Sequence, residues 1–355
     1  MVRAAAARRK AVRLGAGFTA ADDARRGKCQ AHPGHRPRSR PPVIEAKPPL
    51  VIVNPAAGGG RARGFWRQCA AACAGVPFEV IETRRRGDAA DFAAAAGDRL
   101  VIAVGGDGTA HEVVNGLLRR PSGRMPRVGF LQRGTGADLR RSLPSPRRAE
   151  DVPAWLATDR WRAVDVGRVG TSTGRRYFIN VADAGIGAEI VRRAARGPAI
   201  MGGTLNFLSG AVISLLTHQN TLIRLRLDDG PVLNRRVRTV AVANGAYLGG
   251  GMWMAPKARL DDGRFDVVTI GDVSRTLGIR SLPMLYRGTH GQLAQVEFDQ
   301  ARRVEIDSEQ PIGVEADGEL VGHTPAVFEI VPGALQVIDW SPSGILSPDR
   351  ARVSD

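Results

Sequence analysis

Apolar and polar positions alternate along the first part of the chain in a way that predicts strands and helices in turn. Short apolar runs are typical of buried strands, and the stretches between them repeat apolar residues at helical spacing. The predicted strands cover residues 50–53, 78–83, 100–104 and 127–131, and the predicted helices cover 64–74, 88–96 and 110–118. This alternation indicates an open parallel α/β sheet, whose ligands bind at the carboxyl ends of the strands.

The pattern changes after about Asp165 to short strands separated by turns rich in glycine and aspartate. The predicted strands cover 177–181, 222–227, 237–243, 265–270, 303–306, 311–316 and 326–330, with one helix at 204–216. Many strands with few helices predict a β-sandwich-like second domain. We therefore expect an α/β protein with an open parallel α/β domain at 48–168 and a β-rich domain at 169–340. The last strands of the second domain are candidates to return to the first.

The two ends of the chain differ in composition from these domains. Residues 1–47 carry twelve basic and three acidic residues among many prolines and glycines, which predicts a disordered basic tail. Residues 341–355 are expected to form a flexible C-terminus. The tail holds more than half of the net charge of +16. The charge is therefore weak evidence for nucleic-acid binding, and no nucleic-acid motif is recognisable.

Cysteine content and hydropathy bear on the setting of the protein. Apolar residues make up 43% of the 355, which excludes a wholly disordered chain, and three cysteines argue against a disulfide scaffold. We expect a reducing, cytoplasmic setting, with Cys69 and Cys73 as packed thiols. The longest apolar run, 205–216, is interrupted by polar residues and is too short to cross a bilayer. We expect it in the core, with the lining of an acyl-chain pocket as the alternative.

Glycine-rich loops follow three of the predicted strands. The first is Asn54-Pro55-Ala56-Ala57-Gly58, and it opens a helix. Backbone N–H groups and a helix N-terminus can approach a phosphate there, although a plain turn explains this loop equally well on its own. The lysine and hydroxyl of a P-loop are absent from this segment.

The other two loops each add a carboxylate. The second is Gly105-Gly106-Asp107-Gly108-Thr109, and the third is Gly134-Thr135-Gly136-Ala137-Asp138. Asp107 can face a polyphosphate only through a divalent cation, because two unscreened anions repel each other. Three such loops at successive strand ends indicate one shared phosphate-binding site.

These blocks, in this order, resemble the catalytic domain of the diacylglycerol kinase family of lipid kinases, in its bacterial soluble branch, which is related to sphingosine and ceramide kinases. The resemblance covers about residues 50–340 and continues through Asp165-Val166-Gly167, 178–189, Asn244-Gly245, Leu260-Asp261-Asp262-Gly263 and Asp317-Gly318-Glu319. It implies a nucleotide-binding domain like that of NAD kinases and diacylglycerol kinases, followed by a lipid-substrate domain.

The resemblance also implies an ATP site and two magnesium sites. The ATP site matches Asn54, Pro55, Ala56, Ala57, Gly58, Thr83, Gly105, Gly106, Asp107, Gly108, Thr109, Glu112 and Thr135. The carboxylates that organise Mg²⁺ at the phosphates match Asp107, Asp138 and Asp165. A second, structural Mg²⁺ site matches Asp262 with the backbone carbonyls of Arg259 and Arg264.

The activity implied by the resemblance is transfer of the γ-phosphate of ATP to a hydroxyl of diacylglycerol or a related membrane lipid. Such a transfer needs a carboxylate within reach of the hydroxyl. The general base matches the segment that contains Asp317 and Glu319, with Asp107 as a rival. A type I′ hairpin turn is also the commonest use of an Asp-Gly pair, and we expect the base to lie in such a turn.

Alternatives stay open at this point. A kinase of NAD shares the Gly-Gly-Asp-Gly-Thr loop, and a non-catalytic nucleotide or lipid sensor is the alternative outside enzymes. The sensor hypothesis rests on one departure, since Gln132 and Ala137 stand where the family commonly has proline and asparagine. We expect the loss of the asparagine to weaken the hold on the nucleotide. His111 and His323 could touch a phosphate or head group, or be structural.

The partner expected from the resemblance is a lipid substrate at the membrane surface. Arginine-rich surfaces and the basic tail favour peripheral contact with anionic phospholipid, at about 1 kcal/mol per basic residue near the surface. No specific nucleic-acid partner is expected. The oligomeric state is open, with a homodimer as one option.

Overall fold

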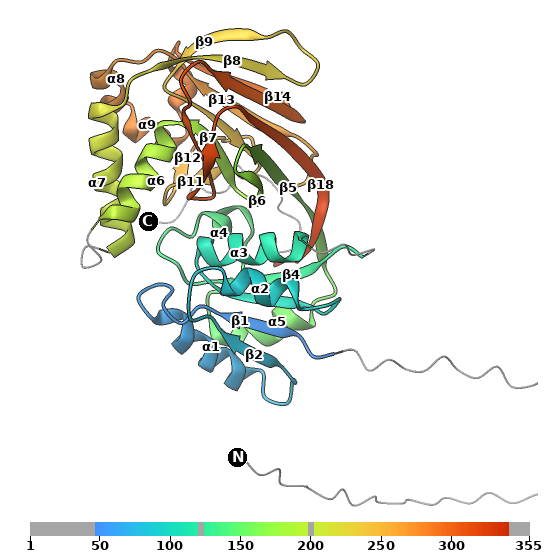
Figure 1. Ribbon diagram of the computed structural model, residues 1–355. Helices are drawn as coiled ribbons and strands as arrows, with labels where there is room; N and C mark the ends of the chain where they lie inside the picture. Colours follow the sequence, from blue (N-terminus) through green and yellow to red (C-terminus); the bar gives the residue numbers. More distant parts are fainter. Residues whose placement is uncertain (1–46, 120–123, 198–201, 341–355) are drawn as a thin grey trace, which may run out of the picture. The chain divides into compact units, whose positions relative to one another are not determined.

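The computed structural model describes residues 47–119, 124–197 and 202–340. Strands and helices alternate through the first part, drawn in blue to green in Figure 1. They are β1 (Leu50–Val53), α1 (Arg61–Ala72), β2 (Glu79–Glu82), α2 (Asp88–Ala94), β3 (Val101–Gly105), α3 (Asp107–Leu118), β4 (Arg127–Gln132), α4 (Asp138–Ser142), the 3₁₀ turn η1 (Ala149–Asp151) and α5 (Val152–Ala157). All four strands predicted here from apolar runs are present.

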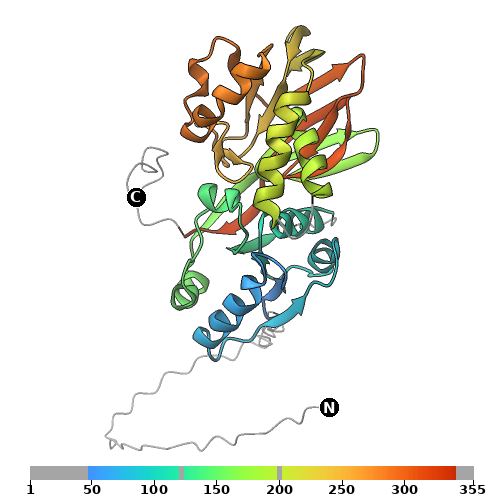
Figure 2. The same ribbon diagram turned by 90° about the vertical axis from the view of Figure 1, so that its left-hand side faces the viewer.

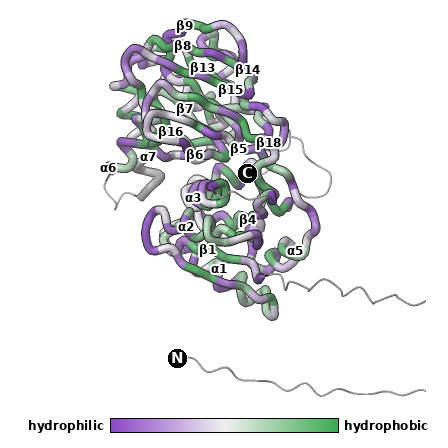
Figure 3. Tube along the Cα trace, turned by 45° about the vertical axis from the view of Figure 1, so that its right-hand side comes forward, coloured by the Kyte–Doolittle hydropathy of each residue, from purple (hydrophilic) through white to green (hydrophobic). Residues whose placement is uncertain are grey.

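Strands β1 to β4 form a parallel sheet in the order β2-β1-β3-β4. Ile52 packs with Val113 of α3 on one face of this sheet, and Val51 packs with Trp66 of α1 on the other. Because helices cover both faces, β1, β3 and β4 form continuous apolar runs in the sequence. Figure 3 shows the resulting hydrophobic stretch at β1.

The second part is rich in strands, as predicted. Its elements are β5 (Trp161–Thr171), β6 (Gly174–Phe178), β7 (Val181–Gly185), α6 (Ile186–Arg196), α7 (Gly202–Thr217), β8 (Thr221–Leu227), β9 (Leu233–Val237), β10 (Thr239–Ala243), β11 (Tyr247–Leu248), β12 (Met252–Trp253), β13 (Phe265–Ile270), α8 (Arg275–Arg280), α9 (Leu282–Arg287), the 3₁₀ turn η3 (His290–Gln292), β14 (Val296–Ala301), β15 (Arg303–Ser308), β16 (Gly313–Ala316), β17 (Glu319–His323) and β18 (Ala326–Ile338).

Strand β18 joins the two parts of the fold. It pairs with β4 in parallel through Gln336 and Val337, and with β5 and β15 in an antiparallel arrangement. The result is a ten-stranded sheet that continues from the parallel strands into β15, β8 and β9 (Figure 1). The parallel α/β half and the β-rich half therefore share one sheet.

The antiparallel half of this sheet packs against a second sheet of order β14-β13-β10-β7-β16-β17. Their shared core contains Phe328 of β18, with Phe178 of β6 stacked on Phe265 of β13 at a ring separation of 5.6 Å. Two sheets packed face to face in this way form a β-sandwich. This confirms the expected fold class, an α/β protein with a parallel N-terminal sheet and a β-sandwich-like second part.

The strand and helix prediction was wrong in several details, and it did not include strands β5, β14 and β17. The single strands expected at 177–181 and 237–243 are each two strands, because the chain passes from the ten-stranded sheet to the six-stranded sheet at Ile179–Asn180 and at Arg238. Strand β18 runs on past Pro332 and Gly333, because an irregularity in its pairing with β5 absorbs these two residues. Helices α6, α8 and α9 accompany the one helix predicted, and Figure 2 shows α6 and α7 packed side by side.

The predictions for the two ends of the chain, for the cysteines and for a membrane span can be compared with the structure only in part. Most of the basic tail and residues 341–355 lie outside the described residues, as does Cys29. Cys69 and Cys73 are free and buried, and burial raises the pKa of the Cys69 thiol to about 12, which is consistent with packed thiols. Among the described residues, no helix combines the length and the apolar character needed to cross a membrane.

Candidate active site

A cavity of about 930 Å³ lies at the carboxyl ends of β1, β3 and β4, between the glycine-rich loops and the β-rich half of the fold. The α/β half contributes residues 54–58, 83–86, 106–109 and 134–136 with Ala89, Glu112 and Asp138 to its lining. The β-rich half contributes Asn180, Val181, Gly187, Ile190, Val191, residues 247–250, Met252, Tyr286, Glu315 and residues 317–319. Thus the sheet edge predicted to bind a ligand does border a cavity.

The first glycine loop is shaped by Asn54. The side-chain oxygen of Asn54 accepts the N–H of Ala56 at 3.1 Å, and its amide donates to Thr109 Oγ1 at 3.0 Å, which ties the first loop to the second. Gly58 has a φ of 63°, and a Cβ there would collide with the carbonyl of Arg133. Only glycine fits this position without strain.

The second and third loops touch each other through their backbones. A Cβ built on Gly134 would lie 2.7 Å from the Cα of Gly106, so neither position has room for a side chain. The loops thus present bare backbone to the cavity, which is the property that favours phosphate binding. Gly105 is the one predicted ATP residue that does not line the cavity, because the side chain of Thr109 fills the space beside it.

Glu112 and the chain after β2 form the next part of the lining. The two carboxylate oxygens of Glu112 accept the N–H groups of Gly87 at 2.9 Å and Ala89 at 3.2 Å, which holds the start of α2. Thr83 lines the cavity beside residues 84–86, which are three consecutive arginines. Glu112 therefore positions this basic turn at the mouth of the cavity.

Asp107 and Asp138 are brought together at the start of α4. Asp107 accepts the N–H groups of Leu139 at 3.2 Å and Asp138 at 3.4 Å, and so caps this short helix. Asp138 accepts the N–H of Gly250 at 2.8 Å and an N–H of Arg141 at 3.0 Å. Burial, with the charge of Asp107 nearby, raises the pKa of Asp138 to about 6. Burial also raises the pKa of Asp107 above its ordinary value.

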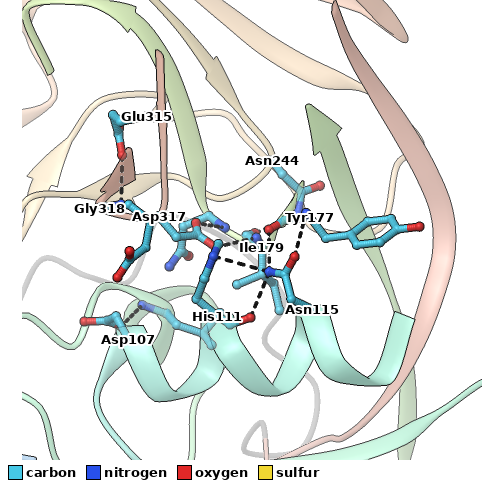
Figure 4. A network of polar contacts seen from close by, with 12 residues as sticks. Asp107, His111, Asn115, Tyr177, Ile179, Asn244, Glu315, Asp317 and Gly318 are labelled. Carbon is cyan, nitrogen blue, oxygen red and sulfur yellow. Dashed lines mark hydrogen bonds and ion pairs between the residues drawn. The ribbon is translucent and has the colours of Figure 1, made fainter. Parts of the chain in front are cut away.

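The carboxylate of Asp317 belongs to a network that Figure 4 shows from close by. It accepts the N–H groups of Ile179 at 2.8 Å and Asn180 at 2.9 Å, and His111 Nδ1 lies 3.2 Å from it. The same interaction explains the interrupted strand at Ile179–Asn180, whose N–H groups point to a carboxylate instead of a neighbouring strand. Asp317 thereby connects α3 to the β-rich half.

Asp317 occupies the turn that its sequence predicts. Asp317 and Gly318 have φ values of 50° and 84° between β16 and β17, the signature of a type I′ hairpin. The first residue after the turn, Glu319, forms an ion pair with Arg86 across the cavity, and no backbone donor of the described chain contacts its carboxylate. Its side chain is 29% exposed. Glu319 is therefore the more accessible carboxylate of the two.

Comparison with known proteins places this arrangement in a family. The diacylglycerol kinase catalytic domain matches residues 48–169, and the YegS C-terminal NAD kinase beta sandwich-like domain matches residues 180–339. A protein of Chromohalobacter salexigens named "Probable lipid kinase YegS-like" is 32% identical over 72% of this chain and 80% of its own length. The diacylglycerol kinase of Bacillus subtilis is 30% identical over 72% of this chain and 83% of its own.

The chain belongs to the diacylglycerol kinase family of lipid kinases. Its fold agrees with the crystal structure of a diacylglycerol kinase from Bacillus anthracis, at a TM-score of 0.62, 22% identity and coverage of 83% of this chain and 97% of that one. Membership implies an enzyme of the kinase type, with ATP as a substrate and a divalent cation as its companion.

The metal-binding residues implied for this kinase family lie in two places. Asp165 is not beside Asp107 and Asp138, because its two oxygens accept the N–H groups of Gly263 and Gly333, each at 2.7 Å. Burial, with the charge of Asp165, raises the pKa of Asp262. Arg259, Asp262 and Arg264 share this loop away from the cavity.

Each of the two places brings two carboxylates together. In the described part of the chain, no three His, Cys, Asp or Glu side chains lie close enough to hold a metal ion together. Mg²⁺ in kinases is bound by one or two carboxylates with phosphate and water, which Asp107 and Asp138 satisfy. At the other loop, Asp165 and Asp262 are neighbouring carboxylates that backbone carbonyls of Arg259 and Arg264 would complement.

The departure from the family loop has a conformational consequence. Ala137 is buried, does not line the cavity and adopts φ 53° and ψ 36°, in the left-handed region that asparagine tolerates better than alanine. Gln132 is also buried, and its side-chain oxygen and nitrogen have no partner in the ranges that the structure describes. Ala137 therefore stores strain in the loop, rather than removing a contact from the cavity lining.

Some residues of the site were not predicted from the sequence. Glu315 lines the cavity, lies opposite Asp183 on the neighbouring strand, and accepts the N–H of Gly318 at 2.8 Å. A carboxylate between apolar residues in each of two strands was the available signal. Of the two histidines, His111 is buried against Asp317 and Asn115, while His323 is exposed and does not line the cavity.

Proposed function

We propose that this protein transfers the γ-phosphate of ATP to a hydroxyl of diacylglycerol or a related membrane lipid. The observation that carries the proposal is the composition of the cavity of about 930 Å³. Bare glycine loops form one side of it, and the carboxylates of Asp317 and Glu319 lie on the other. A phosphate donor and an alcohol can therefore meet between them.

The glycine loops are suited to bind the triphosphate. Backbone N–H groups of residues 58, 59 and 106–109 lie near the starts of α1 and α3, where the helix dipole adds partial positive charge. Arg84 adds a full positive charge to the lining, while Arg85 is paired with Asp88 at 3.2 Å. A magnesium ion held by Asp107 and Asp138 would neutralise phosphate charge.

Glu319 is the carboxylate best suited to act as general base. The oxygens of Asp107 and Asp317 accept backbone N–H groups, whereas Glu319 contacts the exposed guanidinium of Arg86. Glu319 would take the proton of the lipid hydroxyl as that oxygen bonds to the γ-phosphorus and the bond from this phosphorus to ADP breaks. In this proposal Asp317 is a positioning residue that fixes the turn carrying Glu319.

The lipid would approach from the side of α6 and α7. Ile190 and Val191 of α6 line the cavity, and Val212, Ile213 and Leu216 of α7 are exposed apolar side chains. Apolar side chains exposed together on a helix favour contact with a membrane or an acyl chain. The basic tail would add attraction to anionic lipid, and unchanged vesicle co-sedimentation after deletion of residues 1–47 would refute that part.

The decisive experiment is a transfer assay with labelled ATP and a panel of lipids, together with NAD. Label in a lipid supports the proposal, and label in NAD contradicts it. ATP binding without transfer to any acceptor would identify a non-catalytic relative. Glu319→Gln should lose transfer, while Glu309→Gln, an exposed carboxylate of the same half of the fold, should retain it.

A further inference from the structure

A second hollow of about 740 Å³ adjoins the candidate active site. It lies between the segment that follows α4 and the elements β11, β12 and α9, and it shares Tyr247 and Tyr286 with the cavity. Nothing in the proposed transfer requires this hollow. We call it the arginine pocket, after its most frequent lining residue.

Four arginines line this pocket, Arg140, Arg141, Arg147 and Arg287, and none of its described lining residues is acidic. Arg141 is neutralised by Asp138 at 3.0 Å. Arg140 forms no ion pair with the acids of the described segments, and burial together with the charges of Arg147 and Arg141 lowers its pKa. Like charges held close together without a counter-ion are costly, and a bound anion removes that cost.

The remaining lining residues suit a phosphate ester. Ser145 lines the pocket and is 7% exposed, and its buried hydroxyl has no hydrogen-bond partner in the described chain. Tyr247 and Trp253 stack at a ring separation of 5.8 Å on one side and offer a flat surface to an organic group. Guanidinium groups match the oxygens of phosphate in a planar, two-pronged geometry.

We propose that the arginine pocket is a second ligand site, which binds the phosphate monoester group of an anionic lipid or of a soluble phosphate ester. The arginine pocket is lined by arginines and no acid, whereas the cavity is lined mainly by acids. A phosphate therefore needs no accompanying cation to bind in the pocket. The size is within the usual range for pockets that enclose a small ligand. Binding at this site is independent of the proposed transfer reaction.

The test uses calorimetric titration of the full chain without nucleotide. The probes are inorganic phosphate, glycerol 3-phosphate and dihexanoyl phosphatidate below its micelle concentration. The double variant Arg147→Gln/Arg287→Gln removes one exposed arginine from each side of the pocket. Each lost guanidinium–phosphate contact should weaken binding by about tenfold or more. The matched control is Arg175→Gln/Arg176→Gln, two exposed arginines of β6 that line neither hollow and remove the same charge.

The outcomes test two separate points: whether the pocket binds a phosphate ester, and whether that ester is a lipid or a soluble molecule. Weaker binding in the double variant, with the control within about twofold of the parent, supports the pocket. Tighter binding of phosphatidate than of glycerol 3-phosphate then identifies a lipid, and equal binding identifies a soluble ester. No binding of any probe, or equal loss in variant and control, overturns the proposal. Matching thermal unfolding curves show that each variant is folded. Since no transfer is measured, failure here leaves the kinase proposal standing, and the reverse also holds.

Discussion

The candidate active site and the arginine pocket adjoin each other but carry opposite charge. The described lining of the cavity has six acidic and three basic side chains, and that of the pocket has four arginines and no acid. Two tyrosines belong to both. An anion entering the cavity meets carboxylates, so it needs a cation as companion, whereas an anion entering the pocket meets guanidinium groups directly.

The acidic residues of the cavity also differ from one another in their hydrogen-bond partners. The carboxylates of Asp107, Glu112 and Asp317 accept backbone N–H groups and hold the loops in place. Glu319 pairs with the exposed side chain of Arg86 instead. Counting charges alone would therefore miss the division between the carboxylates that hold the backbone of the site and the one that contacts only a side chain.

Removing the divalent cation should give the largest difference between the two regions. We expect excess EDTA to reduce transfer by about 10⁴-fold or more, since metal ions contribute several kcal/mol to such reactions. Binding of inorganic phosphate to the arginine pocket should stay unchanged, as measured by titration in the same buffer. If phosphate binding also falls with EDTA, the pocket depends on a cation as the cavity does, and the two regions do not differ in this respect.

Glu319→Gln should lower kcat for transfer by about 10²- to 10⁴-fold, the usual contribution of a positioned base. The KM for ATP should change little, because Glu319 lies opposite the glycine loops. Initial-rate measurements beside Glu309→Gln provide the check. If kcat is unchanged, Glu319 is not the general base, and Asp317 or Asp107 is the candidate for that role.

Asp317→Ala should act mainly on stability, since it leaves the N–H groups of Ile179 and Asn180 without their acceptor. We expect a loss of about 2–4 kcal/mol in the free energy of unfolding. Denaturant titration measures it, with the exposed residue of β17 changed in His323→Ala as control. A variant as stable as the parent would show that this carboxylate does not build the site.

Two acids beside the cavity should keep their protons to a higher pH in the folded chain than in the unfolded chain. Burial raises the pKa of Asp183 from 3.8 to about 6, and burial with the charge of Asp183 raises the pKa of Glu315 well above 4.5. Their contribution to stability is therefore full below the ordinary pKa values of these acids, and it is lost as the pH rises through the raised values, at about 1.4 kcal/mol per pKa unit.

Glu315→Gln removes one of these titrating groups. Between about pH 5 and pH 8, this variant should lose less stability than the parent, and Glu309→Gln should follow the parent. Thermal unfolding at the two pH values is the measurement. Parallel pH dependence of the parent and Glu315→Gln would mean that Glu315 is already ionised in the fold at the lower pH.

The smallest effect concerns the loop between the two regions. Ala137 precedes α4, which carries Asp138 toward the cavity and Arg140 toward the pocket. Ala137→Asn should stabilise the chain by about 1 kcal/mol, because asparagine adopts the left-handed conformation more readily. Denaturant titration measures this gain.

The control for this substitution is Ala71→Asn, at an exposed position of helix α1. Asparagine has a lower helix propensity than alanine, so this variant should be slightly less stable than the parent. A stabilisation of both variants, or of neither, would mean that the conformation of Ala137 stores no strain.

Local pattern was enough to predict the α/β half and the glycine loops. Continuous apolar runs such as Leu50–Val53 are typical of strands buried on both faces, and glycines at strand ends mark where a backbone can approach a ligand. The block order identified the family, and with it Asp107, Asp138, Asp317 and Glu319, all of which line the cavity.

What the chain did not reveal by itself depends on contacts between distant residues. Asp165 accepts the N–H groups of Gly263 and Gly333 and does not line the cavity. The strand expected at 177–181 is interrupted where its N–H groups donate to Asp317, and Arg147 and Arg287, far apart in the sequence, line the same pocket. Sequence patterns record the burial and backbone freedom of one segment, whereas the partner of a polar side chain is chosen by how the sheets pack. Tertiary structure therefore decided which acids hold the backbone of the site, which one contacts only a side chain, and where arginines gather without an acidic neighbour in the lining.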